Sequence, residues 1–207
     1  MAPDATVPPP DSEGRDAGQA RGGRSGAIFG AETLFEAGSA MHGFKVSVCK
    51  EYLGFSSAHF ITLSGHQCES LHGHNYRIGV TVEGDVDPEC AFVVDFGVLK
   101  RMVRPHVQAM DHKVLLPTRN PKLKLVQEGD RTVVEYQGTA RFVFPASNVA
   151  LLPITNTTAE MIAEFLAEQF RNDLRQEGLT RLDAIEVEVE ESFGQSGYYK
   201  LAMGSGQ

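Results

Sequence analysis

Residues 68–84, CESLHGHNYRIGVTVEG, contain the pattern from which the fold prediction starts. From position 76 onward, larger apolar side chains occupy every second position: Tyr76, Ile78, Val80 and Val82. This alternation is typical of a strand with one buried face. His72 and His74 stand at the entrance to the strand. Because side chains two positions apart in a strand share a face, both imidazoles should point the same way.

The segments on either side of this strand predict a second strand, a third strand and a helix. Residues 44–48, FKVSV, alternate, and so do residues 184–192, AIEVEVEES. In residues 95–110, DFGVLKRMVRPHVQAM, apolar residues recur every three or four positions, which indicates one face of a helix. We expect Asp95 to be its N-cap and Pro105 to kink or interrupt it.

A second helix and an insertion complete the predicted order. Residues 157–174, TTAEMIAEFLAEQFRNDL, have a helical apolar face, and Thr157 with Glu160 forms a capping-box signature. Residues 119–150 contain three alternating runs, which predict an inserted hairpin or three-stranded excursion. With one more short strand near residue 200, this order predicts an α+β fold: a four-stranded antiparallel sheet with two helices on one face.

Composition limits the classes of partner. The chain has 207 residues and a formal net charge of -8, which argues against nucleic acid or an anionic membrane as a partner. No apolar run approaches the roughly 18 residues that span a bilayer. Three scattered cysteines are too few for a disulfide framework, so a reducing, cytoplasmic setting is expected. Residues 1–43, rich in Pro, Gly and Ala, predict a disordered tail before a domain over 44–207, with Met41 as an alternative start.

The histidines suggest a metal site. His59 ends an extended run, GFSSAH, and if this run pairs with the strand after His72, three imidazoles would converge: those of His59, His72 and His74. Three neutral imidazoles leave a tetrahedral Zn²⁺ with one open position, as in catalytic sites. Cys68 would be the fourth ligand of a closed structural site, or a reactive thiol beside the metal. Two exposed histidines on a strand without a metal remain an alternative.

Two further pairs of adjacent residues are candidate functional groups, and each contains a carboxylate. Asp111 and His112 follow the first helix directly, and a carboxylate bonded to an imidazole fixes its tautomer and raises its basicity. The alternative is a histidine favoured by the dipole of the helix end. Glu190 and Glu191 are adjacent on a strand and must face opposite sides. One could bind a planar N–C–NH₂ edge, or both could belong to a solvated strand.

Six blocks, in order, together resemble the 6-pyruvoyl tetrahydropterin synthase / 6-carboxytetrahydropterin synthase family: FSSAH, CESLHGHNY, VVDFGVLK, MDHKVLL, NTTAE and VEVEES. The resemblance covers roughly residues 44–116 and 153–201. It implies the tunnelling fold and a homohexamer with active sites at subunit interfaces. It implies zinc held by His59, His72 and His74. It implies catalysis by Cys68, Asp111 and His112. It implies pterin binding by Glu191, with Thr158 and Glu160 near the pocket.

The resemblance also implies the chemistry. The substrate would be 7,8-dihydroneopterin triphosphate, and the product 6-carboxy-5,6,7,8-tetrahydropterin, an intermediate of queuosine biosynthesis, with release of triphosphate and acetaldehyde. Three residues separate Cys68 from His72, as in the carboxy-forming branch, and Leu71 stands where some branches carry a glutamate. The alternatives are the 6-pyruvoyl synthase, a related aldolase-like lyase, a zinc- and pterin-binding module without activity, and a thiol hydrolase.

Overall fold

The computed structural model describes residues 43–204. The predicted disordered tail, residues 1–43, and the alternative start at Met41 lie outside the described residues, apart from Gly43. Of the two helices described, neither has the length and apolar character needed to cross a membrane.

A six-stranded sheet forms the centre of the fold, in the order β11–β10–β4–β1–β5–β9. Its four long strands are antiparallel: β1 (Phe44–His59), β4 (His72–Gly84), β10 (Leu182–Ser192) and β11 (Gln195–Ala202). This is the predicted four-stranded sheet. Two short strands extend it in parallel: β5 (Val114–Pro117) and β9 (Val149–Leu152). The prediction missed them because each is four residues long, and their pairing joins segments far apart in the chain.

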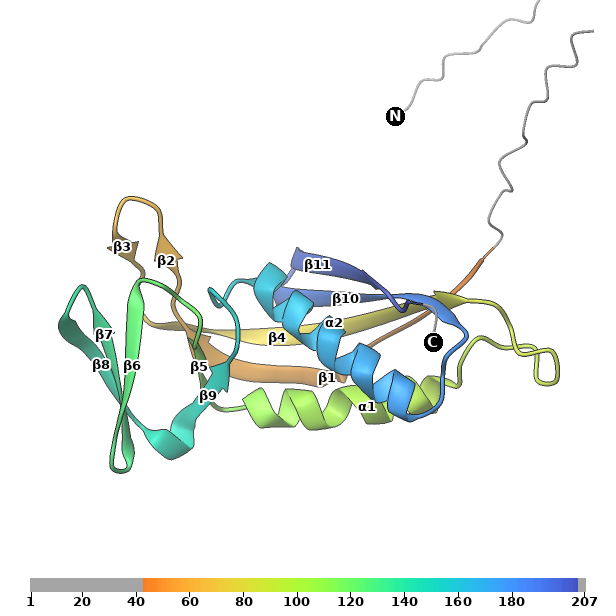
Figure 1. Ribbon diagram of the computed structural model, residues 1–207, viewed down its shortest axis with the longest axis horizontal. Helices are drawn as coiled ribbons and strands as arrows, with labels where there is room; N and C mark the ends of the chain where they lie inside the picture. Colours follow the sequence, from red (N-terminus) through yellow and green to blue (C-terminus); the bar gives the residue numbers. More distant parts are fainter. Residues whose placement is uncertain (1–42, 205–207) are drawn as a thin grey trace, which may run out of the picture. The chain divides into compact units, whose positions relative to one another are not determined.

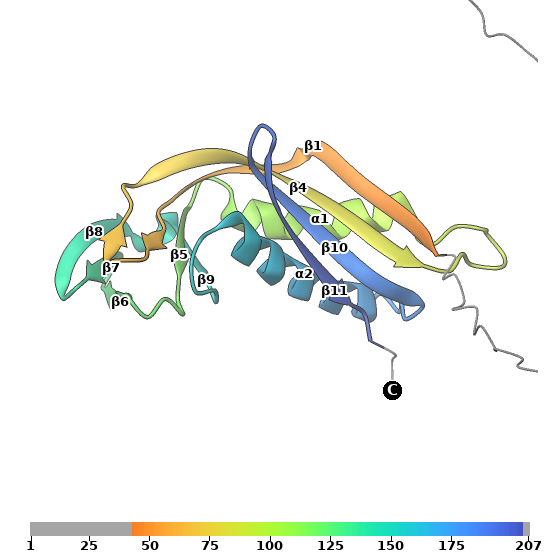
Figure 2. The same cartoon turned by 90° about the horizontal axis from the view of Figure 1, so that it is seen from above.

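Two helices cover one face of this sheet (Figure 1, Figure 2). They are α1 (Phe96–Met110) and α2 (Ala159–Gln176). Asp95 caps α1 as predicted, because its carboxylate accepts the Gly97 N–H. Pro105 lies inside α1, and the helix continues through it rather than ending there. The buried faces of both helices and the inward residues of the strands form one apolar core.

The predicted N-cap of α2 is wrong by one residue. Thr158, not Thr157, is the N-cap, and its side chain accepts from the Met161 N–H. Thr157 is instead fully buried, and its hydroxyl donates to the Phe60 carbonyl at 2.8 Å. Only Thr157 has a glutamate three residues later, as the signature requires, and its tertiary hydrogen bond to Phe60 overrides that local preference.

The predicted insertion forms a separate three-stranded antiparallel sheet. Its strands are β6 (Leu123–Glu128), β7 (Arg131–Tyr136) and β8 (Thr139–Pro145), followed by the short 3-10 helix η1 (Ala146–Asn148). It packs beside a hairpin of two very short strands, β2 (Thr62–Leu63) and β3 (Gln67–Cys68) (Figure 1). Phe60, Leu116 and Val134 form a second small core between these parts.

A bulge in β1 sets the position of the site. Between Cys49 and Gly54 the register with β4 shifts, so that β1 has three more residues than its partner in this stretch. The inward face of β1 therefore changes from even positions, such as Val48, to odd positions, such as His59. Gly54 is required there, because an added Cβ would lie 2.4 Å from the Tyr76 carbonyl oxygen.

Candidate active site

The three predicted histidines converge. His59 at the end of β1 is paired with His72 at the start of β4, and His74 lies two residues farther along the same face. One ring nitrogen of each lies within 4.8 Å of those of the others. His59 is buried, at 2% exposure, whereas the other two are half-buried. The convergence that the sequence left conditional on strand pairing is therefore confirmed.

Backbone carbonyls fix how two of these rings are protonated. Nδ1 of His59 donates to the Thr157 carbonyl at 2.7 Å, and Nδ1 of His72 donates to the Ser70 carbonyl at 2.9 Å. A carbonyl can only accept, so in each neutral ring the proton lies on Nδ1 and the Nε2 lone pair is free. The two Nε2 atoms face each other at 3.1 Å. Burial lowers the pKa of His59, which favours the neutral, ligating form.

This donor set fits a divalent metal ion. Two neutral lone pairs in contact repel each other unless a cation lies near both. With zinc–nitrogen bonds of about 2.0–2.1 Å, the nitrogens of a tetrahedral site are about 3.3 Å apart, close to the observed separation. Carbonyls that accept from the opposite ring nitrogens are the usual outer partners of ligating histidines. The three histidines could therefore hold a metal ion.

Glu191 is the glutamate that faces this cluster. Its Oε1 lies 3.3 Å from Nε2 of His59 and 3.8 Å from Nε2 of His74, and it accepts from the Tyr76 hydroxyl at 3.3 Å. Burial, and next the Glu191 charge, raise the pKa of Tyr76. Glu190 points to the opposite side and pairs with Arg77. The predicted opposition of the two glutamates is confirmed.

A cavity of about 480 Å³ opens beside the histidines. The site residues that line it are His59, His72, Glu69, Thr158, Glu160 and Glu191. Five of these six were predicted from the sequence. Glu69 was not, although it stands three residues before His72; its carboxylate lies 3.8 Å from Nδ1 of that histidine. Polar character alone did not distinguish it from its neighbours in the loop.

Comparison with known proteins agrees with this geometry. Residues 47–201 match the sequence model described as 6-pyruvoyl tetrahydropterin synthase. The chain belongs to this family. A relative from Methanocaldococcus jannaschii, named as a putative 6-carboxy-5,6,7,8-tetrahydropterin synthase, is 34% identical over 149 residues, which is 72% of this chain and 90% of the relative.

Solved structures of the pterin synthase family have the same tunnelling fold. The Plasmodium falciparum 6-pyruvoyl tetrahydropterin synthase matches with a TM-score of 0.73 and 28% identity, over 77% of this chain and 98% of that one. A Plasmodium vivax 6-pyruvoyltetrahydropterin synthase matches over the same shares, with a TM-score of 0.72 and 25% identity. That structure is described as a catalytic residue mutant in which a glutamate is changed to alanine.

The family resemblance implies that Cys68 is the catalytic thiol. Cys68 directly precedes Glu69, which lines the cavity, but Cys68 itself does not line it. Its side chain is half-buried and packs against the small core around Phe60. Burial raises the pKa of the Cys68 thiol, and the nearby Arg141 cation partly opposes this. Among the residues 43–204, the metal-ligand cluster contains the three histidines without Cys68.

Asp111 and His112 form the predicted pair in another place. The Asp111 carboxylate lies 2.9 Å from Nδ1 of His112, and it accepts the Ser56 N–H, which lowers the pKa of Asp111. His112 has the left-handed φ of 57°, and its side chain is 82% exposed. The imidazole lines a second hollow of about 440 Å³, together with His74 of the metal cluster, Asn75 and Asn148. Within one chain, His112 therefore does not line the cavity beside His59, but it shares a hollow with His74 of the metal cluster.

Proposed function

We propose that this chain is a zinc-dependent 6-carboxy-5,6,7,8-tetrahydropterin synthase that acts on 7,8-dihydroneopterin triphosphate. The observation that carries the proposal is the convergence of three imidazoles, two of which, His59 and His72, line a cavity that the carboxylates of Glu69 and Glu191 also line. The name of the Methanocaldococcus relative supports the carboxy product over the pyruvoyl product. The product would enter queuosine biosynthesis, which fits a cytoplasmic enzyme.

His59, His72 and His74 would hold the zinc ion. When bound, zinc would act as a Lewis acid that lowers the pKa of hydroxyl groups on the substrate side chain. Two of the three imidazoles, those of His59 and His72, are oriented before any ion binds, since they donate to backbone carbonyls.

The far side of the cavity would bind the pterin ring. The Glu191 carboxylate can accept two hydrogen bonds from the planar N–C–NH₂ edge of a pterin. Thr158 and Glu160 are at the start of α2 and line the same cavity. Since the Thr158 hydroxyl already accepts a backbone N–H as the helix cap, its contribution would be to shape the wall.

Two side chains could remove the proton from the substrate carbon next to the ring. Cys68 is the thiol implied by the family resemblance, and its raised pKa requires activation before it can act as a base. Glu69 is favoured by position, because it lines the cavity and because a Plasmodium vivax relative is described with a catalytic glutamate. We propose both as candidates for this step, which a comparison of Cys68 and Glu69 variants separates.

Asp111 and His112 would exchange a proton with a side-chain oxygen of the substrate. Neither residue lines the cavity beside His59 in the same chain, and His112 instead shares a second hollow with His74, so we propose that the pair serves the cavity of a neighbouring copy in a homohexamer. The high exposure of His112 supports this assignment, because an imidazole that acts across an interface must be open in the single chain.

The alternative function is 6-pyruvoyl tetrahydropterin synthase, which the names of the Plasmodium structures favour. The two activities differ in the fate of the three-carbon side chain. The test is incubation of the zinc-loaded protein with 7,8-dihydroneopterin triphosphate, followed by mass analysis. A carboxypterin with acetaldehyde supports the proposal. An intact three-carbon side chain refutes it in favour of the pyruvoyl synthase, a hydroxymethyl side chain indicates an aldolase-like lyase, and binding without turnover indicates a non-catalytic module.

A further inference from the structure

The loop that carries Cys68 and Glu69 has little structure of its own. β2 and β3 have two residues each, and one further backbone bond joins the Glu69 N–H to the Ile61 carbonyl at 2.9 Å. An isolated two-stranded hairpin is marginally stable in water even when it is longer. Within the loop, the Glu69 carboxylate accepts the Ile61 N–H in a long bond of 3.4 Å, so the direction of this side chain into the cavity also depends on contacts from other parts of the fold.

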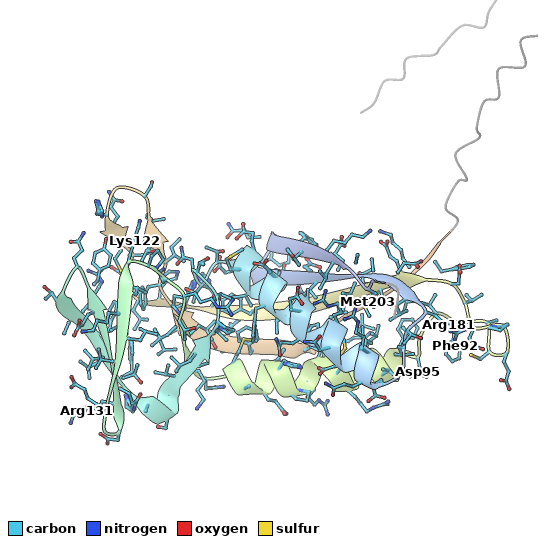
Figure 3. The ribbon with its side chains drawn as sticks, viewed as in Figure 1. Phe92, Asp95, Lys122, Arg131, Arg181 and Met203 are labelled. Atoms are coloured by element: carbon cyan, nitrogen blue, oxygen red, sulfur yellow. The ribbon has the colours of Figure 1, made fainter. Side chains whose placement is uncertain are left out.

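The inserted segment provides these contacts. Nδ2 of Asn120 donates to the Thr62 hydroxyl at 2.9 Å, and the Lys122 ammonium donates to the carbonyl of Leu63 in the β2–β3 hairpin. Lys122 is labelled in Figure 3, where it lies beside this hairpin. Farther along the chain, the ring of Phe142 packs on the Phe60 ring, with centroids 4.8 Å apart. The inserted segment thus contacts the hairpin, and Phe60 just before it, at several points.

Arg141 on β8 makes the contact nearest to the cavity. Its Nη2 donates to the Cys68 carbonyl at 2.9 Å and to the Glu69 carbonyl at 3.2 Å. These two carbonyls belong to the peptide groups immediately before and after the Cα of Glu69. When both peptide groups are held, the backbone dihedrals of Glu69 are held, and so is the direction in which its side chain leaves the chain.

We infer that Arg141 is a positioning residue, which holds the Cys68–Glu69 turn so that the Glu69 carboxylate is aimed into the cavity at the reacting end of the substrate. The inference rests on the proposed function of the cavity. It assigns a role to the inserted sheet: the sheet braces the turn from outside the cavity. The planar guanidinium is suited to this, because its donors have a fixed geometry that an ammonium lacks.

The test compares Arg141→Ala, Arg141→Lys and Arg131→Ala in the zinc-loaded full chain. Arg131 is the matched control, an exposed arginine at the opposite end of the same inserted sheet (Figure 3). We expect Arg141→Ala to lower kcat about 10- to 100-fold, as small misplacements of catalytic groups do. KM for the pterin, zinc content and Tm should match those of Arg131→Ala, because Arg141 does not line the cavity. Arg141→Lys should recover part of kcat, since its ammonium can still donate to a carbonyl.

Hydrogen exchange provides a second readout that needs no turnover. The Glu69 amide should exchange faster in Arg141→Ala than in Arg131→Ala. Equal kcat in the two alanine variants, or a loss of kcat that is matched by zinc loss or a lower Tm, would overturn the inference. If the wild type does not turn over the pterin, the proposed function fails separately. In that case unchanged exchange at Glu69 would overturn the positioning role as well, and faster exchange would support it.

Discussion

Thr157 connects the core to the metal cluster, and its hydroxyl can be removed with little change of shape. It is fully buried, its hydroxyl donates to the Phe60 carbonyl at 2.8 Å, and its own carbonyl accepts from Nδ1 of His59 at 2.7 Å. The hydroxyl anchors the residue whose carbonyl orients the imidazole. We therefore predict that Thr157→Val weakens both folding stability and metal binding, although Thr157 is not a ligand.

The two effects have separate magnitudes. Valine leaves the buried Phe60 carbonyl without its donor, which costs about 1–3 kcal/mol in the free energy of unfolding of the metal-free protein. The Thr157 carbonyl, which accepts from the His59 ring, would also be less firmly held. Disturbing a group that is hydrogen-bonded to a ligating histidine typically lowers metal affinity about 10- to 100-fold. Thr157→Ser keeps the hydroxyl and loses a methyl group, so it should retain most of the metal affinity.

The assay starts from protein stripped with a chelator. Urea unfolding gives the stability of the metal-free form, and competition with a chromophoric chelator gives the zinc affinity of each variant. The outcome that refutes the reasoning is equal zinc affinity for Thr157→Val and Thr157→Ser, because the His59 ring would then be oriented independently of the hydroxyl. A loss of stability without a loss of affinity would have the same meaning.

Three further predictions concern single side chains. If Glu69 is the base, Glu69→Gln should lower kcat about 10²- to 10⁴-fold. Cys68→Ala is measured beside it by steady-state kinetics, and the variant with the larger loss of kcat identifies the base. Equal small losses would exclude both residues. Glu191→Gln should raise KM for the pterin about 10- to 100-fold through loss of a charge-assisted bond, while zinc analysis shows full occupancy; zinc loss would instead identify a metal ligand. The pKa of Asp87 is lowered from 3.8 to about 2 by backbone N–H groups and by Arg181, so the ionised form stabilises the fold above about pH 4, and this stability is lost as the pH falls toward 2. The difference in unfolding free energy between wild type and Asp87→Asn should shrink over that range, and a constant difference would contradict the assignment.

Much of the cluster could be predicted from alternation alone. His72 and His74 share a face with Tyr76 because the strand has a period of two. The same rule, extended from the apolar positions Val187 and Val189, places Glu191 on the core side and Glu190 on the other. The signal for Glu191 was therefore present in the strand itself, beyond the resemblance that first indicated it.

The position of His59 could not be predicted from alternation alone. Continued from Val48 without interruption, the alternation of β1 would have put His59 on the outer face. The bulge that reverses the two faces forms because Gly54 allows β1 to approach β4 very closely. The sequence pattern of β1 cannot predict how closely the two strands approach, because that distance also depends on β4.

The sequence by itself determined the two helices, the four long strands, the inserted strands and the identity of the candidate metal ligands. These depend on periodicity and on side-chain chemistry, which are local properties of the chain. Only the tertiary structure decided that Glu69 lines the cavity while Cys68 packs outside it, and that His112 lines a second hollow, which it shares with His74. Such placements depend on contacts between segments far apart in the chain, such as the two bonds from Arg141 to the turn.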